Sequence, residues 1–421
     1  MSIEDFRGQG PPGDIGQFIF PGQVMIFHYT FSGTVYTCAM RSGERGWVLV
    51  SYLPETSVNN STVFDVAIAT LPVGGGTIWV ASELFLLKST VTLLDNCVLK
   101  STLLGNELRA DAGFIGTQII EMGDFTRCEG IYVNGDGHKV AQGFSCPGIN
   151  ITLFYCAVQG CDIGVYVNQS NIFILTCWIE GNYVGVQIRN KEHSKIVACI
   201  FVNNTSGAAV PKGDVYITGG AACIRQTIIG NSSETSWCFI NVQGACSDSD
   251  FNDNDIYASD GAAFIINGNL SNTRINDNTF DGANYTPYFL QSLGGVTVTN
   301  VMCSDNSVRQ WATSCFSEAA TGRVMKFDNY TYNPVGVIAN PYPVAAGDLD
   351  DVAAAQAFPT SNTNYTVVGS PKLITIYGGT VTSISIGGTV TGLTSGVFYL
   401  KPSQVLNVVW TGQPSSVVFA Q

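Results

Sequence analysis

The sequence predicts an all-β protein whose main body is a right-handed parallel β-helix. The chain has 421 residues with 46 Gly, and only 12% of its residues are charged. Its polarity therefore comes from Ser, Thr, Asn and Gly, a composition that favours short strands joined by tight turns. A short pattern also recurs every 21 to 28 residues. The pattern lacks the 3.6-residue period of helical repeats and the LxxLxL spacing of leucine-rich repeats, which leaves a β-solenoid.

The repeat is clearest in the stretch RINDNTFDG, residues 274–282. Asn278 has an apolar residue, Ile275, three places before it and another, Phe280, two places after it. The same frame fits seven segments, and both flanking positions are apolar in all of them. A small central side chain suits a sharp bend, because Asn tolerates the left-handed region and forms hydrogen bonds along a stack. The seven predicted corner residues are Cys156, Cys177, Cys199, Thr227, Asn254, Asn278 and Asn306.

The pattern divides the chain into four parts. Residues 1–60 are turn-rich with strand-like runs and predict a small β head. Residues 61–335 hold the repeats. Residues 336–365 are rich in Pro, Ala and Asp and indicate a linker. Residues 366–421 alternate strictly and predict a β-sandwich-like domain.

Two stretches resemble known families. The segment FDVAIATLPVGGGTIWV at residues 64–80 resembles the entry of pectate-lyase-like (pectin-lyase-like) β-helices. The resemblance implies a short helix at about residues 62–71 that caps the solenoid, whose open end would otherwise expose a strand edge and the core. The motif GGTVTSISI…TGLTSGVFYLKPSQVLNVVW near the end resembles a C-terminal module of bacteriophage tail spike and tail fibre proteins. This chain differs from the module at Ser403 and Gln404, where Gly-Asp is usual. The order of head, solenoid and tail module makes the resemblance to phage tail spikes more specific than the solenoid alone.

The resemblance implies a virion protein that binds host-surface polysaccharide during adsorption. It also implies a homotrimer of side-by-side solenoids whose N-terminal domain attaches to a tail or baseplate protein. The alternative is a spike with polysaccharide depolymerase activity, a hydrolase or lyase acting on capsule or lipopolysaccharide. A secreted wall-degrading enzyme is disfavoured, because the N-terminus has neither the basic nor the apolar region of a signal peptide. Virion proteins are made in the host cytoplasm and need no such peptide, so we expect a location in the virion tail.

Charge and cysteine use exclude several other classes. The net charge of −13 opposes binding to nucleic acid. No apolar run is long enough for a membrane span, so no membrane insertion is expected. The 13 Cys are scattered singly without zinc spacing, and neither a metal nor a cofactor is expected. Both disulfides and buried thiols that act as small apolar side chains are compatible with this pattern.

Candidate site residues follow from the repeat. Positions one and three places after a corner alternate with a buried residue and should face outward. Polysaccharide-cleaving enzymes use Asp or Glu as acid, base or nucleophile. The candidate catalytic residues are Asp255, Asp281 and Glu180, and the candidate substrate-binding residues are Trp178, Tyr257 and Arg309. Asp255 and Asp281, on adjacent coils, form the sharpest pair, since coils about 4.8 Å apart bring carboxylates within hydrolase range.

Ordinary structural roles are also compatible with several of these residues. Asp253, Asp277 and Asp305 directly precede corner residues. Asp beside a bend commonly hydrogen-bonds turn amides, so these three are expected to be structural. The outward carboxylates are also compatible with ordinary solvent-facing residues, and Trp178 and Tyr257 with a trimer seam.

Overall fold

The structure is a computed structural model. It describes residues 23–31, 33–43, 46–54, 60–101, 106–189, 191–204, 213–219, 223–234, 236–257, 261–282, 287–310, 315–327, 329–332, 361–366, 372–377, 380–401, 403–412 and 415–420. The first 22 residues of the predicted head and residues 336–360 of the predicted linker lie outside the described residues.

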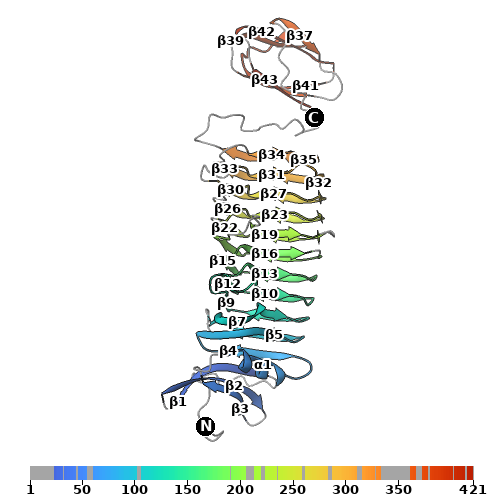
Figure 1. Cartoon of the computed structure of the whole chain (residues 1–421). Coiled ribbons are helices and arrows are strands. Elements are labelled where there is room, and N and C mark those ends of the chain that lie inside the picture. Colours follow the sequence, from blue (N-terminus) through green and yellow to red (C-terminus); the bar gives the residue numbers. More distant parts are fainter. Residues whose placement is uncertain are drawn as a thin grey trace.

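Residues 76–332 form the predicted parallel β-helix, in which successive coils stack along one axis (Figure 1). Its strands pair in parallel with the equivalent strands of the coils before and after, and so build three long ladders. The fold class that the repeat predicts is thus confirmed.

The first ladder runs along one side of the solenoid. It consists of β4 (Gly76–Val80), β6 (Cys97–Ser101), β8 (Arg127–Glu129), β11 (Ile151–Phe154), β14 (Ile172–Leu175), β17 (Lys195–Val197), β21 (Thr227–Ile229), β25 (Asp250–Asn252), β29 (Arg274–Asn276), β32 (Thr297–Ser304) and β35 (Thr321–Phe327). A short side ladder that ends on β32 consists of β20 (Cys223–Ile224), β24 (Cys246–Ser247) and β28 (Leu270–Ser271).

The second and third ladders both start from two long strands, β5 (Leu84–Leu93) and β7 (Asn106–Met122). The second ladder continues through β9 (Ile131–Asn134), β12 (Ala157–Gln159), β15 (Trp178–Glu180), β18 (Ile200–Val202), β22 (Ser232–Glu234), β26 (Asp255–Tyr257), β30 (Thr279–Asp281), β33 (Ser307–Arg309) and β36 (Tyr330–Tyr332). The third continues through β10 (Gln142–Cys146), β13 (Ile163–Val167), β16 (Val184–Arg189), β19 (Gly213–Thr218), β23 (Ile240–Val242), β27 (Phe264–Ile266), β31 (Leu290–Ser292) and β34 (Phe316–Glu318).

The interior is one apolar column that is covered at its N-terminal end. Inward residues of all three ladders form a single buried cluster. Helix α1 (Ser61–Ala69) forms at the predicted cap, and it buries Val63 and Phe64 with the rest of its apolar face. The Phe64 ring meets Phe85 of β5 edge-on at 5.6 Å. The cap therefore removes the exposed sheet end that a bare solenoid would present.

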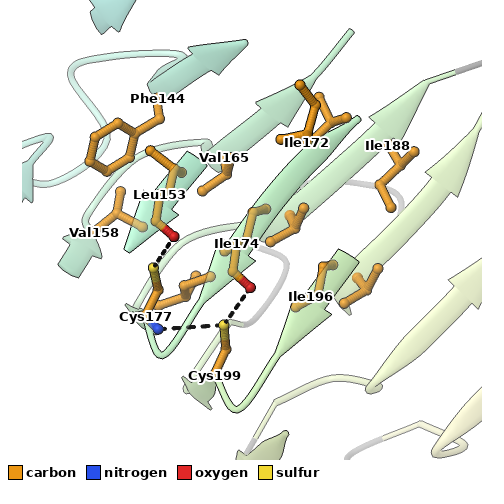
Figure 2. Close-up of a cluster of buried hydrophobic side chains, with 14 of the residues drawn as sticks. Phe144, Leu153, Val158, Val165, Ile172, Ile174, Cys177, Ile188, Ile196 and Cys199 are labelled. Carbon is orange, nitrogen blue, oxygen red and sulfur yellow. Dashed lines mark hydrogen bonds between the residues drawn. The ribbon is translucent and has the colours of Figure 1, made fainter. Parts of the chain in front are cut away.

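The corner between the first and second ladders is built by thiols in its early coils. The Cys177 backbone N–H donates to Cys199 Sγ at 3.4 Å, and the Cys199 thiol donates to the Ile174 carbonyl at 3.4 Å (Figure 2). The Cys199 thiol thus receives a hydrogen bond from one residue of the preceding coil and gives one to another. The sulfur satisfies two backbone groups that a buried bend would otherwise leave unpaired.

In later coils an Asn side-chain amide makes the equivalent hydrogen bonds. Asn278 Nδ2 donates to the Phe251 carbonyl at 2.9 Å, and Asn278 Oδ1 accepts the Asn254 backbone N–H at 3.0 Å. The amide adds a side-chain bond along the stack, because Asn254 Nδ2 also donates to Asn278 Oδ1 at 2.9 Å. This buried asparagine ladder consists of Asn231, Asn254, Asn278, Asn306 and Asn329.

One predicted corner, Thr227, is wrong. β21 pairs with β17 so that Ile196 lies beside Ile228, and the Cys199 N–H bonds to Asn231 Oδ1 at 2.9 Å. The corner is therefore Asn231, 32 residues after Cys199. The segment around Thr227 has the same apolar spacing by coincidence, and only lateral pairing selects the correct frame. The other six predicted corners lie at the corner.

The residue before each corner adopts the left-handed conformation, with φ between 50° and 69°. Asp253, Asp277 and Asp305 occupy this position in three successive coils, which fits their predicted structural role. Short polar side chains and Gly accept this region at low cost. The column consists of Gly130, Tyr155, Thr176, Ala198, Gly230, Asp253, Asp277 and Asp305.

The N-terminal strands continue the solenoid sheet. β1 (Gln23–Phe31), β2 (Thr34–Gly43) and β3 (Gly46–Pro54) form an antiparallel meander. β1 also pairs in parallel with β4, so the first ladder begins at this meander. All 13 Cys of the chain are buried thiols, and no disulfide joins them.

The C-terminal strands form two antiparallel sheets around their own core of Ile374, Ile384, Leu406 and other apolar residues. One sheet consists of β37 (Thr363–Thr366), β42 (Val405–Gly412), β39 (Thr380–Ile386) and β40 (Thr389–Val390). The other consists of β41 (Gly396–Leu400), β38 (Lys372–Tyr377) and β43 (Ser415–Ala420). Two sheets that share one core make the β-sandwich-like unit that the sequence predicts.

The two departures from the tail-module motif lie in one turn of this unit. Gln404 Oε1 accepts the Lys401 backbone N–H at 2.7 Å, a bond that an Asp is also suited to make. Ser403 has φ 68°, a conformation that favours Gly. We expect Ser403→Gly to raise stability by about 0.5–1 kcal/mol, since it relieves left-handed strain. Thermal unfolding of the two proteins checks this, and a lower melting temperature for the Gly variant would contradict it.

Candidate functional site

The outer face of the second ladder holds all six predicted site residues. Each of its three-residue strands turns the middle side chain inward and the other two outward, as in β15, where Ile179 is buried between Trp178 and Glu180. The strands pair in register, so the outward residues form two rows along the solenoid axis.

A groove of about 630 Å³ lies on this face over the early coils. Its walls are mostly aromatic and aliphatic, with a few polar side chains. They consist of Gly130, Ile131, Tyr132, Tyr155, Cys156, Ala157, Gln159, Thr176, Cys177, Trp178, Glu180, Ala198 and Ile200. A concave, mainly apolar surface with few polar groups is the usual form of a ligand site.

Trp178 is the largest side chain of the groove, and 45% of it is exposed. Its Nε1–H donates to Glu180 Oε2 at 2.8 Å, and this bond fixes the edge of the indole. Tyr155, 49% exposed, and Ile200, 38% exposed, belong to the coils on either side. Three neighbouring coils thus present apolar side chains to solvent at one place, which costs hydration free energy unless a ligand covers them.

The N-terminal end of the groove meets a charged network. Arg109 makes two bonds to Glu107, Nε to Oε1 at 2.7 Å and a second to Oε2 at 2.8 Å. Asn134 Nδ2 also donates to Glu107 Oε1 at 2.7 Å. Burial and the Glu107 carboxylate raise the pKa of Tyr132 to about 12, so its phenol stays a hydrogen-bond donor at neutral pH.

The remaining predicted residues lie on later coils. Tyr257, Asp281 and Arg309 are successive members of one outward row. Asp255 belongs to the other row, where its neighbours are Ser232 and Thr279. Asp255 and Asp281 are thus diagonal neighbours on adjacent coils, with Cα atoms about 8 Å apart from the strand spacing and rise.

Glu234 is a further carboxylate of this face that the sequence interpretation missed. It lies in β22 beside Tyr257 of β26, and so on the other diagonal of Asp255. Glu234 stands three places after the true corner Asn231, an outward position. The incorrect repeat frame at Thr227 therefore left it out of the candidate residues. Tyr132, Tyr155 and Ile200 were also missed, since nothing local marks them as neighbours of Trp178.

The corner aspartates form a separate column. Burial raises the pKa of Asp277, and the charges of Asp253 and Asp305 in the neighbouring coils raise it further. Their left-handed backbone assigns them to the bend. Among the described residues, no group of three or more His, Cys, Asp or Glu is placed to hold a metal ion. No helix in that part of the chain has the length and apolar character needed to cross a membrane.

Comparison with known proteins adds structural neighbours. No family model and no curated protein sequence matches the chain. Among solved structures, a tailspike of E. coli bacteriophage HK620 matches with 12% identity and a TM-score of 0.49, over 86% of this chain and 89% of that one. The structural neighbours of this chain therefore include phage tailspikes.

Two further neighbours are similarly distant. Tailspike gp49 of Acinetobacter baumannii bacteriophage Fri1, a capsular polysaccharide depolymerase, matches with 11% identity and a TM-score of 0.46, over 99% of this chain and 96% of that one. The pre-mature gene product 12 of bacteriophage phi29 matches with 11% identity and a TM-score of 0.39, over 63% of this chain. The match spans about half, 55%, of that protein. Because these sequence identities and TM-scores are low, the fold class rests on the strand pairings of the chain itself.

Proposed function

We propose that this chain is a phage tail spike or tail fibre that binds host-surface glycan in the groove around Trp178. The observation that carries the proposal is the exposed apolar cluster of Tyr155, Trp178 and Ile200 beside the Glu180 carboxylate. Aromatic faces stack on the C–H faces of sugars, and carboxylate and amide groups bind their hydroxyls. The order of capped solenoid and C-terminal module, which resembles that of phage tail proteins, supports the virion role.

The proposal extends to assembly. Residues 1–60 would attach the protein to a tail or baseplate partner, and three copies would associate side by side. The protein would then act in the virion tail, outside the host that made it. Its acidic net charge of −13 fits a surface that meets glycan rather than nucleic acid.

A second candidate function is polysaccharide cleavage. The observation that favours it is the diagonal placement of Asp255 between Glu234 and Asp281. A Cα separation of about 8 Å on adjacent strands is compatible with the carboxyl separation of inverting glycosidases, roughly 6.5–9.5 Å. Glu180 belongs to the groove some coils away and would serve glycan binding in this scheme, although it remains the third candidate carboxylate.

One experiment separates binding from cleavage. The full chain is incubated with purified host capsule or lipopolysaccharide, and the products are tested for new reducing ends and unsaturated sugars. If the protein cleaves, Asp255→Asn or Asp281→Asn should lower the rate at least a hundredfold, the usual contribution of an acid or base. The exposed carboxylate Asp248, on a different corner, provides the control Asp248→Asn, which should leave the rate unchanged.

The outcomes are distinct. Binding without products supports the adhesin and contradicts the depolymerase. If both Asp variants give the same yield of products as the parent protein, the catalytic residues lie elsewhere on the solenoid. Absence of the protein from purified virions, together with no glycan binding, would contradict the whole proposal.

A further inference from the structure

The groove around Trp178 has no positive charge on its walls. Its 13 lining residues include no Lys, Arg or His, and their one carboxylate is Glu180. The Glu180 carboxylate already accepts the indole N–H through Oε2. A carboxylate has about four acceptor sites, so Glu180 keeps acceptors for a ligand in the groove, whose described lining holds no Lys, Arg or His.

Two of the cations on the flanking strands, Arg109 and Arg127, are paired with acids of their own, and Lys195 of β17 lies over the Phe173 ring. Arg109 of β7 binds Glu107 through two hydrogen bonds. Arg127 of β8 lies 3.3 Å from Glu129, and its guanidinium stacks over Phe154 at 5.3 Å. A negatively charged ligand would therefore compete with existing ion pairs for Arg109 and Arg127.

We infer that the groove binds an uncharged pyranose segment and rejects acidic sugars. This rests on the proposed function and specifies its ligand. An acidic sugar would lose hydration, meet Glu180 and find no partner for its own charge, which is the costly case for a desolvated ion. A neutral sugar places its C–H face on Trp178 and Tyr155 and donates hydroxyls to Glu180 and Gln159.

The test uses matched polysaccharides. Purified bacterial surface polysaccharides that are neutral, and acidic ones in native and carboxyl-reduced form, are titrated calorimetrically into the full chain. Neutral and carboxyl-reduced polymers should bind, and native acidic ones should bind at least tenfold more weakly. Trp178→Ala should weaken neutral binding about tenfold, the scale of one aromatic contact. Phe125→Ala, which removes an exposed aromatic side chain outside the groove, is the control.

Glu180→Gln tests the charge separately. A Gln oxygen can still accept the Trp178 N–H, so the indole should stay in place and its fluorescence maximum should not shift. Affinity for native acidic polymers should then rise at least threefold. The inference is overturned if native acidic polymers bind in a way that depends on Trp178 and this binding disappears on carboxyl reduction. That result would leave the proposed function intact. Neutral binding that Trp178→Ala does not change overturns the groove as the site, and no binding to any glycan refutes the proposed function itself.

Discussion

Replacing Asn278 with Val should destabilise the chain by about 3–5 kcal/mol. The change leaves the Phe251 carbonyl and the Asn254 backbone N–H without partners in the buried corner. It also removes the hydrogen bond that Asn254 Nδ2 donates to Asn278 Oδ1. Each buried polar group left unsatisfied costs about 1–3 kcal/mol, so two or three of them account for the total. Urea unfolding followed by circular dichroism measures the loss.

Asn278→Cys is the informative control. Cys199 fills the same corner position in an earlier coil, where it accepts an N–H and donates to a carbonyl. A Cys at 278 should therefore keep both backbone bonds, and the loss should be less than half of that for Val. Equal losses for Cys and Val would show that the corner depends on side-chain shape rather than on these hydrogen bonds.

The second large effect concerns Asp214, a carboxylate buried inside the solenoid. It accepts hydrogen bonds from Ser233 Oγ at 2.5 Å, Ser236 Oγ at 2.6 Å and Asn204 Nδ2 at 2.8 Å. Burial nevertheless outweighs these bonds and raises its pKa to about 7. Cys238 lies close by, and burial raises the pKa of that thiol, which the Asp214 charge raises further.

The direction of the pH effect follows from the raised pKa. The stabilising contribution of protonated Asp214 is complete below the unfolded pKa of 3.8 and is lost as pH rises to about 7. The shift corresponds to about 4 kcal/mol. Asp214→Asn removes this titration, so the variant should match the parent at pH 4 and exceed its stability by a few kcal/mol at pH 8.

Unfolding by urea at pH 4, 6 and 8 checks the Asp214 prediction. Asp250→Asn, at a partly exposed carboxylate paired with Arg274 at 2.7 Å, is a suitable comparison and should not gain stability at high pH. A variant Asp214→Asn that is less stable than the parent at pH 8 would show that the three hydrogen bonds outweigh the cost of the buried charge.

The local pattern of the sequence was enough to determine the solenoid. Apolar residues three before and two after a small corner residue reflect the pleat and the bend of one coil, and these are local properties. They correctly locate Asn254, Asn278 and Asn306 and the outward direction of Trp178 and Glu180. The same locality explains the failure at Thr227, since its neighbours repeat the spacing without occupying the corner.

Only the tertiary structure decided which coils lie side by side and therefore what the sites contain. The interval from Cys199 to Asn231 is longer than the others, and lateral hydrogen bonds across it choose the frame that brings Glu234 beside Tyr257. The groove joins Tyr132, Tyr155, Trp178 and Ile200 from four coils. Asp214 meets Asn204 and Ser233 inside the solenoid in the same way. These contacts depend on the register between coils, a property of the stacked chain that no single repeat encodes.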